Sequence, residues 1–153
     1  MWVPVNRPVA LAMTTADVIH SFWIPRLAGK RDVIAGRVNR LAFTPDSVGT
    51  FLGQCAEYCG ESHANMRVRV MVESDAAFQA WVAREGAAPA PLDSGSAAWR
   101  GRQVFARSAC IGCHTMEDVP AARAQLGPNL SHVGSRTTIG SGLFPNDTDH
   151  LRR

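Results

Sequence analysis

The stretch GQCAEYCGESHANM, from Gly53 to Met66, concentrates metal-binding side chains in one short run. Its candidate ligands are Cys55, Cys59, His63 and Met66. Their spacings of four, four and three residues would form one stripe on a helix, but a helix rises about 1.5 Å per residue and would separate the outer two by about 16 Å. That separation is too large for one ion. The stretch is therefore a loop or serves more than one ion, and its Gly, Ser and Asn residues favour the loop.

Apolar and polar residues alternate on both sides of this stretch, as they do in β-strands. The apolar positions are Val9, Leu11 and Met13, then Leu41 and Phe43, and after the stretch Val68, Val70 and Val72. Turn signals between these short strands favour an antiparallel sandwich or barrel. An amphipathic helix at SDAAFQAWVAREG, residues 74–86, follows the last strand. We therefore predict an all-β domain over residues 1–85, closed by this helix.

A second domain is predicted beyond a linker. The segment GAAPAPLDSGS, residues 86–96, has the Ala, Pro, Gly and Ser content of a semi-rigid linker. Helical spacing resumes after Ser96, a good N-cap, and leads into CIGCH at Cys110–His114. From Thr115 onward the sequence is rich in turn-forming residues. We expect a small helical domain over residues 97–153.

The bulk composition fits a folded protein. The chain has 153 residues, of which 46% are hydrophobic and 19% charged, with a net charge of +3. Its basic residues are scattered and form no block interleaved with aromatic residues, which argues against nucleic-acid binding. No window approaches the run of about 20 apolar residues that crosses a bilayer, and the start lacks the pattern of a signal peptide. We expect a soluble chain, and its opening in what reads as mid-strand indicates a fragment.

We call Cys55, Cys59, His63 and Met66 the first cluster, and their ligand types favour copper. Two thiolates, an imidazole and a thioether suit a soft metal, whereas a hard cation would need carboxylates. A second imidazole is available from His20 in ADVIHSFWIP, which follows a predicted strand. Three alternatives stay open on spacing alone: a Cys55–Cys59 disulfide, a structural zinc site that includes His63, and purely structural roles for His20 and Met66.

Several segments together resemble the periplasmic copper domain of cytochrome c oxidase subunit II. They are HSFWIP (20–25), LAGK (27–30), Pro45 with Gly49, and GQCAEYCGESHANM (53–66), and the resemblance covers residues 1 to about 85. It implies a cupredoxin-like β-sandwich that holds a binuclear copper A centre. Two thiolates that bridge both metals let an unpaired electron spread over the pair, so the implied site is an electron relay.

The resemblance also implies a role for each ligand. Cys55 and Cys59 would bridge both coppers, and His20 and His63 would each bind one. Met66 would be a weak ligand, and so would the backbone carbonyl of Glu57. In this family the Glu57 side chain also faces a magnesium site at the interface with subunit I.

The motif CIGCH predicts covalent haem attachment. In Cys-x-x-Cys-His the two thiols, here Cys110 and Cys113, add to the haem vinyl groups, and the histidine, here His114, binds the iron. A thioredoxin-like redox pair and half of a zinc site are the alternatives. The segment GPNL, with Pro128, resembles the Gly-Pro-x-Leu segment that packs beside the haem in class I cytochromes c, and this resemblance covers residues 97–153.

The second haem ligand has no clear source in the sequence. Class I cytochromes c supply a methionine well beyond the Gly-Pro-x-Leu segment, and no methionine follows Met116 here. Met116 is too close to His114 to reach the opposite haem face. His132 and His150 are the remaining candidates, but we expect instead that the chain ends before its distal ligand, which makes the cytochrome c domain incomplete.

These resemblances together imply subunit II of a haem–copper terminal oxidase with a fused cytochrome c domain, truncated at both ends. Electrons would pass from cytochrome c or another donor to haem c, then to copper A, and then to subunit I, where oxygen is reduced. Within the complex the activity would be that of cytochrome-c oxidase, and the chain alone would be an electron carrier. The expected location is the periplasmic face of the bacterial inner membrane, with helices before the chain as the anchor. A metallochaperone-like copper module and the copper A domain of a nitrous oxide reductase are the alternatives.

Overall fold

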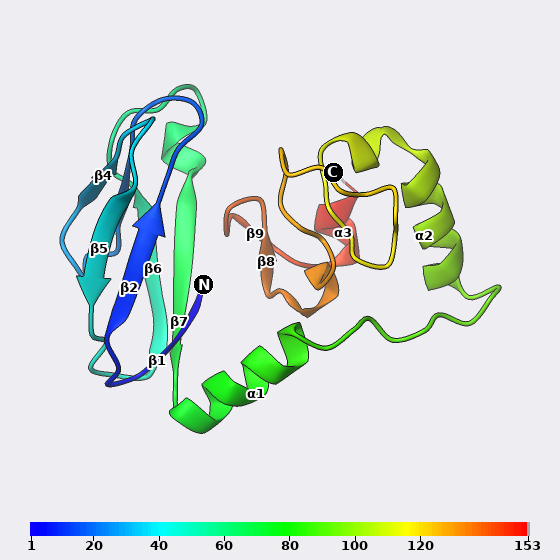
Figure 1. Ribbon diagram of the computed structural model, residues 1–153, viewed down its shortest axis with the longest axis horizontal. Coiled ribbons are helices and arrows are strands. Elements are labelled where there is room, and N and C mark those ends of the chain that lie inside the picture. The colour runs from blue at the N-terminus through cyan, green and yellow to red at the C-terminus, as the bar shows by residue number, and fades with distance from the viewer. Residues whose placement is uncertain (153) are drawn as a thin grey trace. The chain divides into compact units, whose positions relative to one another are not determined.

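The computed structural model describes residues 1–152, and Figure 1 traces its elements in chain order. The chain divides into two compact units. The first joins residues 1–83 to the segment that starts at Thr137, and the second spans Arg84–Arg136. The predicted boundaries at residues 85 and 96 stay a prediction, and each unit is described by itself below.

The first unit is built on a five-stranded sheet whose strand order is β1-β7-β6-β3-β4. These strands are β1 (Trp2–Pro4), β3 (His20–Trp23), β4 (Arg31–Val33), β6 (Gly49–Cys55) and β7 (Arg67–Glu73). β1 pairs with β7 in parallel, and the other pairs are antiparallel. β2 (Val9–Met13) and β5 (Asn39–Phe43) form a separate antiparallel pair. The unit is thus mostly β with a curled sheet, consistent with the predicted cupredoxin-like class.

The core of this unit lies on one face of β7 and its neighbours. Val3, Ile24, Val70 and Val72 form its buried centre. The alternation in RVRVMV is confirmed, because Val70 and Val72 are fully buried while Arg67 is exposed. Burial of these apolar side chains is the main stabilising term of the sheet.

A helix follows β7 as predicted. α1 spans Asp75–Glu85, and the Ser74 hydroxyl accepts a hydrogen bond from the Ala77 N–H at 3.2 Å, which caps its first turn. Its Trp81 ring stacks on Trp2 with the ring centroids 5.8 Å apart. This stacking ties the helix to the first strand.

The second unit contains one regular helix, α2 (Ala97–Arg107), among its described residues. The Ser96 hydroxyl accepts from the Trp99 N–H at 3.0 Å, so the predicted N-cap is confirmed. Two 3-10 turns follow, η2 (Ala109–Gly112) and η3 (Val133–Ser135). An ion pair between Arg102 and Asp118 at 2.7 Å fastens the helix to the following loop. The structure does not show the predicted cytochrome c fold, which stays a prediction.

The C-terminal segment folds as a small hairpin and a short helix. β8 (Thr138–Ile139) pairs with β9 (Phe144–Pro145) in antiparallel fashion, and α3 (Thr148–Leu151) follows. Sequence reasoning assigned these residues to the helical domain, whereas their contacts place them in the first unit. Within residues 1–152, no helix reaches the length and apolar character that a membrane span requires.

Candidate metal centre

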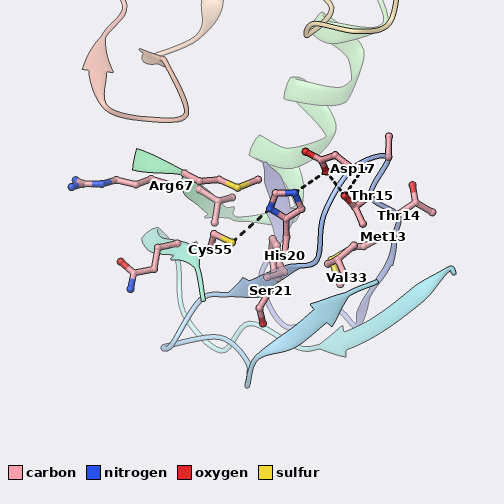
Figure 2. Close-up of a pocket in the computed structure, with 14 residues that line it drawn as sticks. Met13, Thr14, Thr15, Asp17, His20, Ser21, Val33, Cys55 and Arg67 are labelled. Carbon is pink, nitrogen blue, oxygen red and sulfur yellow. Dashed lines mark hydrogen bonds and ion pairs between the residues drawn. The ribbon is translucent and has the colours of Figure 1, made fainter. Parts of the chain in front are cut away.

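The first cluster forms where β3 and β6 run side by side. His20 starts β3 and Cys55 ends β6. The two strands are hydrogen-bonded neighbours with Phe22 opposite Cys55, which places a histidine 35 residues away in sequence next to the cysteine. The close-up in Figure 2 shows the His20 ring between Cys55 and Asp17.

The stretch from Cys55 to Met66 is a closed loop, as predicted. The Cys55 N–H donates to the Met66 carbonyl at 2.9 Å, which joins its two ends. A single 3-10 turn, η1 (His63–Asn65), lies within it and presents His63. The loop therefore gathers ligands that a straight helix would hold apart.

The structure brings all the predicted ligand atoms together in one chain of contacts. The sulfur of Cys55 lies 3.8 Å from His20 Nδ1 and 3.8 Å from the sulfur of Cys59. The Cys59 sulfur lies 3.5 Å from His63 Nδ1 and 3.8 Å from the Met66 sulfur. The Glu57 carbonyl oxygen is 3.2 Å from the Cys55 sulfur.

The distance between the Cys55 and Cys59 sulfurs tests the alternative of a disulfide bond. Cys55 and Cys59 are free thiols 3.8 Å apart, whereas a disulfide bond measures about 2.05 Å. The ligand atoms of His20, Cys55 and Cys59 all lie within 4.8 Å of one another. This histidine–cysteine–cysteine group could bind a metal ion.

Asp17 completes the surroundings of His20. Its Oδ1 accepts from His20 Nε2 at 3.0 Å and from the Thr15 hydroxyl at 2.7 Å (Figure 2). These two hydrogen bonds lower the pKa of Asp17 to about 2, and the bond to Asp17 raises the pKa of His20 against the effect of burial. With the Nε2–H donated to Asp17, Nδ1 carries the lone pair that a metal ligand needs. Sequence reasoning missed Asp17, although its position three residues before His20 was available as a signal.

The two thiols differ in their readiness to ionise. Burial opposes ionisation of Cys55, but backbone groups of Ser21 and Glu57 and the side chains of His20 and Cys59 together lower its pKa to about 6. Burial and the neighbouring Cys55 raise the pKa of Cys59. Metal binds the thiolate form, and Cys55 becomes a thiolate at lower pH than Cys59. We therefore expect Cys55 to bind a metal ion first.

Glu57 and Tyr58 face outward from the loop. Both side chains are exposed, and Tyr58 is 76% exposed. The Tyr58 ring meets the His63 ring edge-on with the centroids 5.7 Å apart. Glu57 thus offers its carbonyl to the cluster and its carboxylate to the surface.

The second cluster consists of the residues predicted to attach haem, which are Cys110, Cys113, His114 and Pro128, and the structure brings them together. The His114 N–H donates to the Cys110 carbonyl at 3.0 Å, which winds the motif into one tight turn. Nδ1 of His114 lies 2.8 Å from the Pro128 carbonyl oxygen. The Gly127 N–H donates to the Cys113 carbonyl at 2.7 Å, so the GPNL segment is fixed against the motif.

The two remaining histidines differ in their surroundings. His150 belongs to the first unit, pairs with Asp147 at 2.8 Å and stacks on Phe144. His132 belongs to the second unit together with His114. Within the described part of the chain, its Nε2 is buried without a hydrogen-bond partner.

The first unit is thus a mostly β domain with a curled sheet, and a sulfur–nitrogen donor cluster that could bind a metal ion lies at its strand ends. The family described as cytochrome c oxidase subunit II, periplasmic domain, matches residues 1–74. This part of the chain is thus similar to the periplasmic domain of cytochrome c oxidase subunit II.

Two similar proteins extend this likeness over most of the chain. The chain is 37% identical over 148 residues to cytochrome c oxidase subunit 2 of Alkalihalophilus pseudofirmus, covering 96% of this chain and 42% of that protein. It is 36% identical over 159 residues to the same subunit of Bacillus sp. (strain PS3), covering 99% of this chain and 44% of that protein. The chain thus spans less than half the length of these two relatives, and both matches extend well beyond residue 74.

A solved structure agrees with the fold. The crystal structure of the periplasmic domain of subunit II of cytochrome oxidase (CoxB) of Bradyrhizobium japonicum matches with a TM-score of 0.53 and 43% identity. The match covers 55% of this chain and 61% of that one.

Proposed function

We propose that this chain is the electron-transfer part of subunit II of a haem–copper oxidase and that its first unit holds a binuclear copper A centre. The observation that carries the proposal is the pairing of two free thiols 3.8 Å apart, each with its own imidazole nitrogen within 3.8 Å. The match of residues 1–74 to the periplasmic domain of cytochrome c oxidase subunit II independently supports a copper domain.

The donor set fits two ions better than one. A metal–thiolate bond is about 2.3 Å long, so two sulfurs 3.8 Å apart can both bind the same ion. His20 contacts the Cys55 sulfur, while His63 and Met66 contact the Cys59 sulfur. With two ions bound, His20 would hold one and His63 with Met66 the other, and both thiolates would be available to each. A thioether in the set favours copper over zinc.

The copper pair, when bound, accepts and releases one electron at a time. Residues of this chain hold the ligands in fixed positions. The β3–β6 pairing holds His20 beside Cys55, the loop-closing bond from Cys55 to Met66 fixes the ends of the loop, and Asp17 orients the His20 ring. Ligands that move little between oxidation states make electron transfer fast, so the rigid sheet serves the relay.

We also propose that Cys110 and Cys113 attach haem c and that His114 binds its iron. The hydrogen bond from His114 Nδ1 to the Pro128 carbonyl supports this proposal, because it places the ring proton on Nδ1 and leaves the Nε2 lone pair for the metal. A second supporting feature lies in the described part of the same unit, where Nε2 of His132 is buried without a hydrogen-bond partner. A buried polar atom normally has a partner, and a bound group would supply the one that is missing.

The proposed electron path runs from cytochrome c or another donor to haem c, then to copper A, and then to subunit I, where oxygen is reduced. The complex would be a cytochrome-c oxidase at the periplasmic face of the bacterial inner membrane, and this chain would be its electron carrier. The exposed Glu57 carboxylate would reach a magnesium ion at the subunit I interface. The proposed organisation is a copper domain at 1–85, a linker at 86–96 and a cytochrome c domain that begins at residue 97, with residues 137–152 grouped with the first unit.

Metal analysis with electron paramagnetic resonance of the purified full chain tests the copper proposal. We expect two coppers per chain that share one unpaired electron. A single-copper signal, or zinc in place of copper, would contradict it. His20→Ala should abolish the shared-electron signal, whereas a reversible copper-binding module would keep its metal without His20. His150→Gln is the matched control, because Asp147 and Phe144 already engage that ring.

Mass spectrometry tests the haem proposal. A chain matured in a host that attaches haem c should gain the mass of one haem, and Cys110→Ala and Cys113→Ala should each reduce covalent attachment. A matured chain that carries no haem would contradict this part of the proposal and leave the copper part standing.

A further inference from the structure

The turn between β8 and β9 lies against the donor cluster within the first unit. A cavity of about 380 Å³ separates them. The cluster side of this cavity is lined by His20, Cys59, Ser62, His63, Asn65 and Met66. The opposite side is formed by Gly140, Ser141 and Leu143 of the turn. The C-terminal segment therefore forms one wall of the space in front of Cys59.

One arginine anchors the turn. Arg69 Nη2 donates to the Gly142 carbonyl oxygen at 3.0 Å, across 73 residues of sequence. Arg69 is half-buried, whereas Arg67, two residues earlier on β7, is exposed. A Cβ added to Gly142 would lie 3.3 Å from Arg69 Nε, so the backbone and the guanidinium are in close contact. A charged donor makes this a stronger anchor than a neutral hydrogen bond.

The turn has its own folded shape. Three successive residues adopt left-handed backbone conformations, with φ values of 57° at Gly140, 57° at Ser141 and 82° at Gly142. Glycine occupies two of these positions, where a side chain would be unfavourable. The Leu143 N–H donates to the Gly140 carbonyl at 3.2 Å. An ordered turn loses less conformational entropy on docking than a flexible one.

We propose that the turn Gly140–Leu143 is a docking element that seats on the first unit through Arg69 and shields the Cys59 side of the donor cluster from molecules in solution. Its partner surface is Arg69 of β7 and the loop that carries the ligands. The segment continues directly from Arg136, the last residue of the second unit.

Alkylation of Cys59 tests the shielding directly. The full chain is prepared reduced and without copper or haem, so that the result is independent of the proposed function. It is treated in parallel with iodoacetamide and with a bulky fluorescein maleimide, and modification of each cysteine is followed by peptide mass spectrometry. Arg69→Gln should accelerate bulky modification of Cys59 roughly threefold to tenfold, the range expected when a hydrogen bond of typical net strength is lost. Cys110, in the second unit, is the internal reference.

Arg67→Gln is the matched control, since it removes the same charge from the same strand. Leu143→Ser is a second variant that disturbs the wall from the turn side, and far-ultraviolet circular dichroism checks that each variant is folded. Selective acceleration of Cys59 in Arg69→Gln and Leu143→Ser supports the proposal. Equal rates in all variants overturn it, and so does an equal acceleration by Arg67→Gln, which would show an effect of charge alone.

Discussion

The position of Gly127 against His114 leaves no room for a side chain. A Cβ at residue 127 would lie 2.5 Å from His114 Cε1 and 2.7 Å from Nδ1. We expect Gly127→Ala to displace the ring, break its bond to Pro128, and destabilise the second unit by roughly 1–3 kcal/mol, as overpacking does. Urea unfolding and covalent haem content measure the effect.

Gly112→Ala is the control for this prediction. Gly112 lies inside CIGCH, yet a Cβ there would meet nothing within 4 Å. It should therefore be tolerated sterically. Equal stability and haem content in both variants would show that His114 does not depend on the close approach of Gly127.

The ionisation of Cys55 depends on its neighbours. A cationic His20 favours the Cys55 thiolate, and Asp17 keeps His20 protonated to higher pH by raising its pKa. In the metal-free chain we expect the first thiol to titrate near pH 6, the pKa of about 6 at Cys55. Asp17→Asn should lower the pKa of His20 and thereby move this thiol midpoint to higher pH. The thiolate absorbance at 240 nm measures the midpoint.

Asp75→Asn is the control for this titration, because the Asp75 carboxylate pairs with Arg7 at 2.7 Å. It removes the same charge and should leave the midpoint unchanged. A midpoint that stays near pH 6 in Asp17→Asn would contradict the assigned link from Asp17 through His20 to Cys55.

At Gly53, strand β6 packs closely against its neighbours. A Cβ at this position would overlap the Trp23 carbonyl oxygen and lie 2.6 Å from Ile24 Cγ1 and 2.9 Å from Val68 Cγ1. Gly53→Ala must therefore push β6 away from β3, the contact that brings His20 to Cys55. We expect a loss of stability of roughly 1–3 kcal/mol and weaker copper binding, measured by urea unfolding and copper titration. Gly29→Ala, where a Cβ would meet nothing within 4 Å, should change neither quantity.

Some elements were readable from sequence and others were not. Strand β7 was predictable because alternation over seven residues distinguishes a half-buried strand. Helix α2 was predictable from its N-cap and periodicity. The two-residue strands β8 and β9 carry too few residues to show a period, and their docking on Arg69 depends on a contact across 73 residues. Sequence reasoning therefore assigned them to loop.

At the scale of the whole molecule, the C-terminal segment should share the stability of the first unit. Val70 is fully buried in the core of that unit, and Val70→Ala should cost about 2 kcal/mol. Hydrogen–deuterium exchange followed by mass spectrometry should show faster exchange in residues 1–83 and in residues 137–152, while α2 keeps its protection. Val38→Ala, at a position 57% exposed, is the control. Faster hydrogen–deuterium exchange in α2 as well as in the first unit would contradict the division of the chain into two units.

The amino-acid sequence by itself determined which donor groups both clusters offer. Ligand type is a local property, so the residue types and spacing of GQCAEYCGESHANM were enough to indicate a soft metal, and those of CIGCH were enough to indicate haem attachment. Only the tertiary structure decided which distant groups complete these sites. Strand pairing placed His20 beside Cys55, and hydrogen bonds from side chains to backbone carbonyls joined His114 to Pro128 and Arg69 to Gly142. The physical reason is that such contacts depend on strand register and on the closure of loops many residues long. A local sequence pattern encodes neither of these.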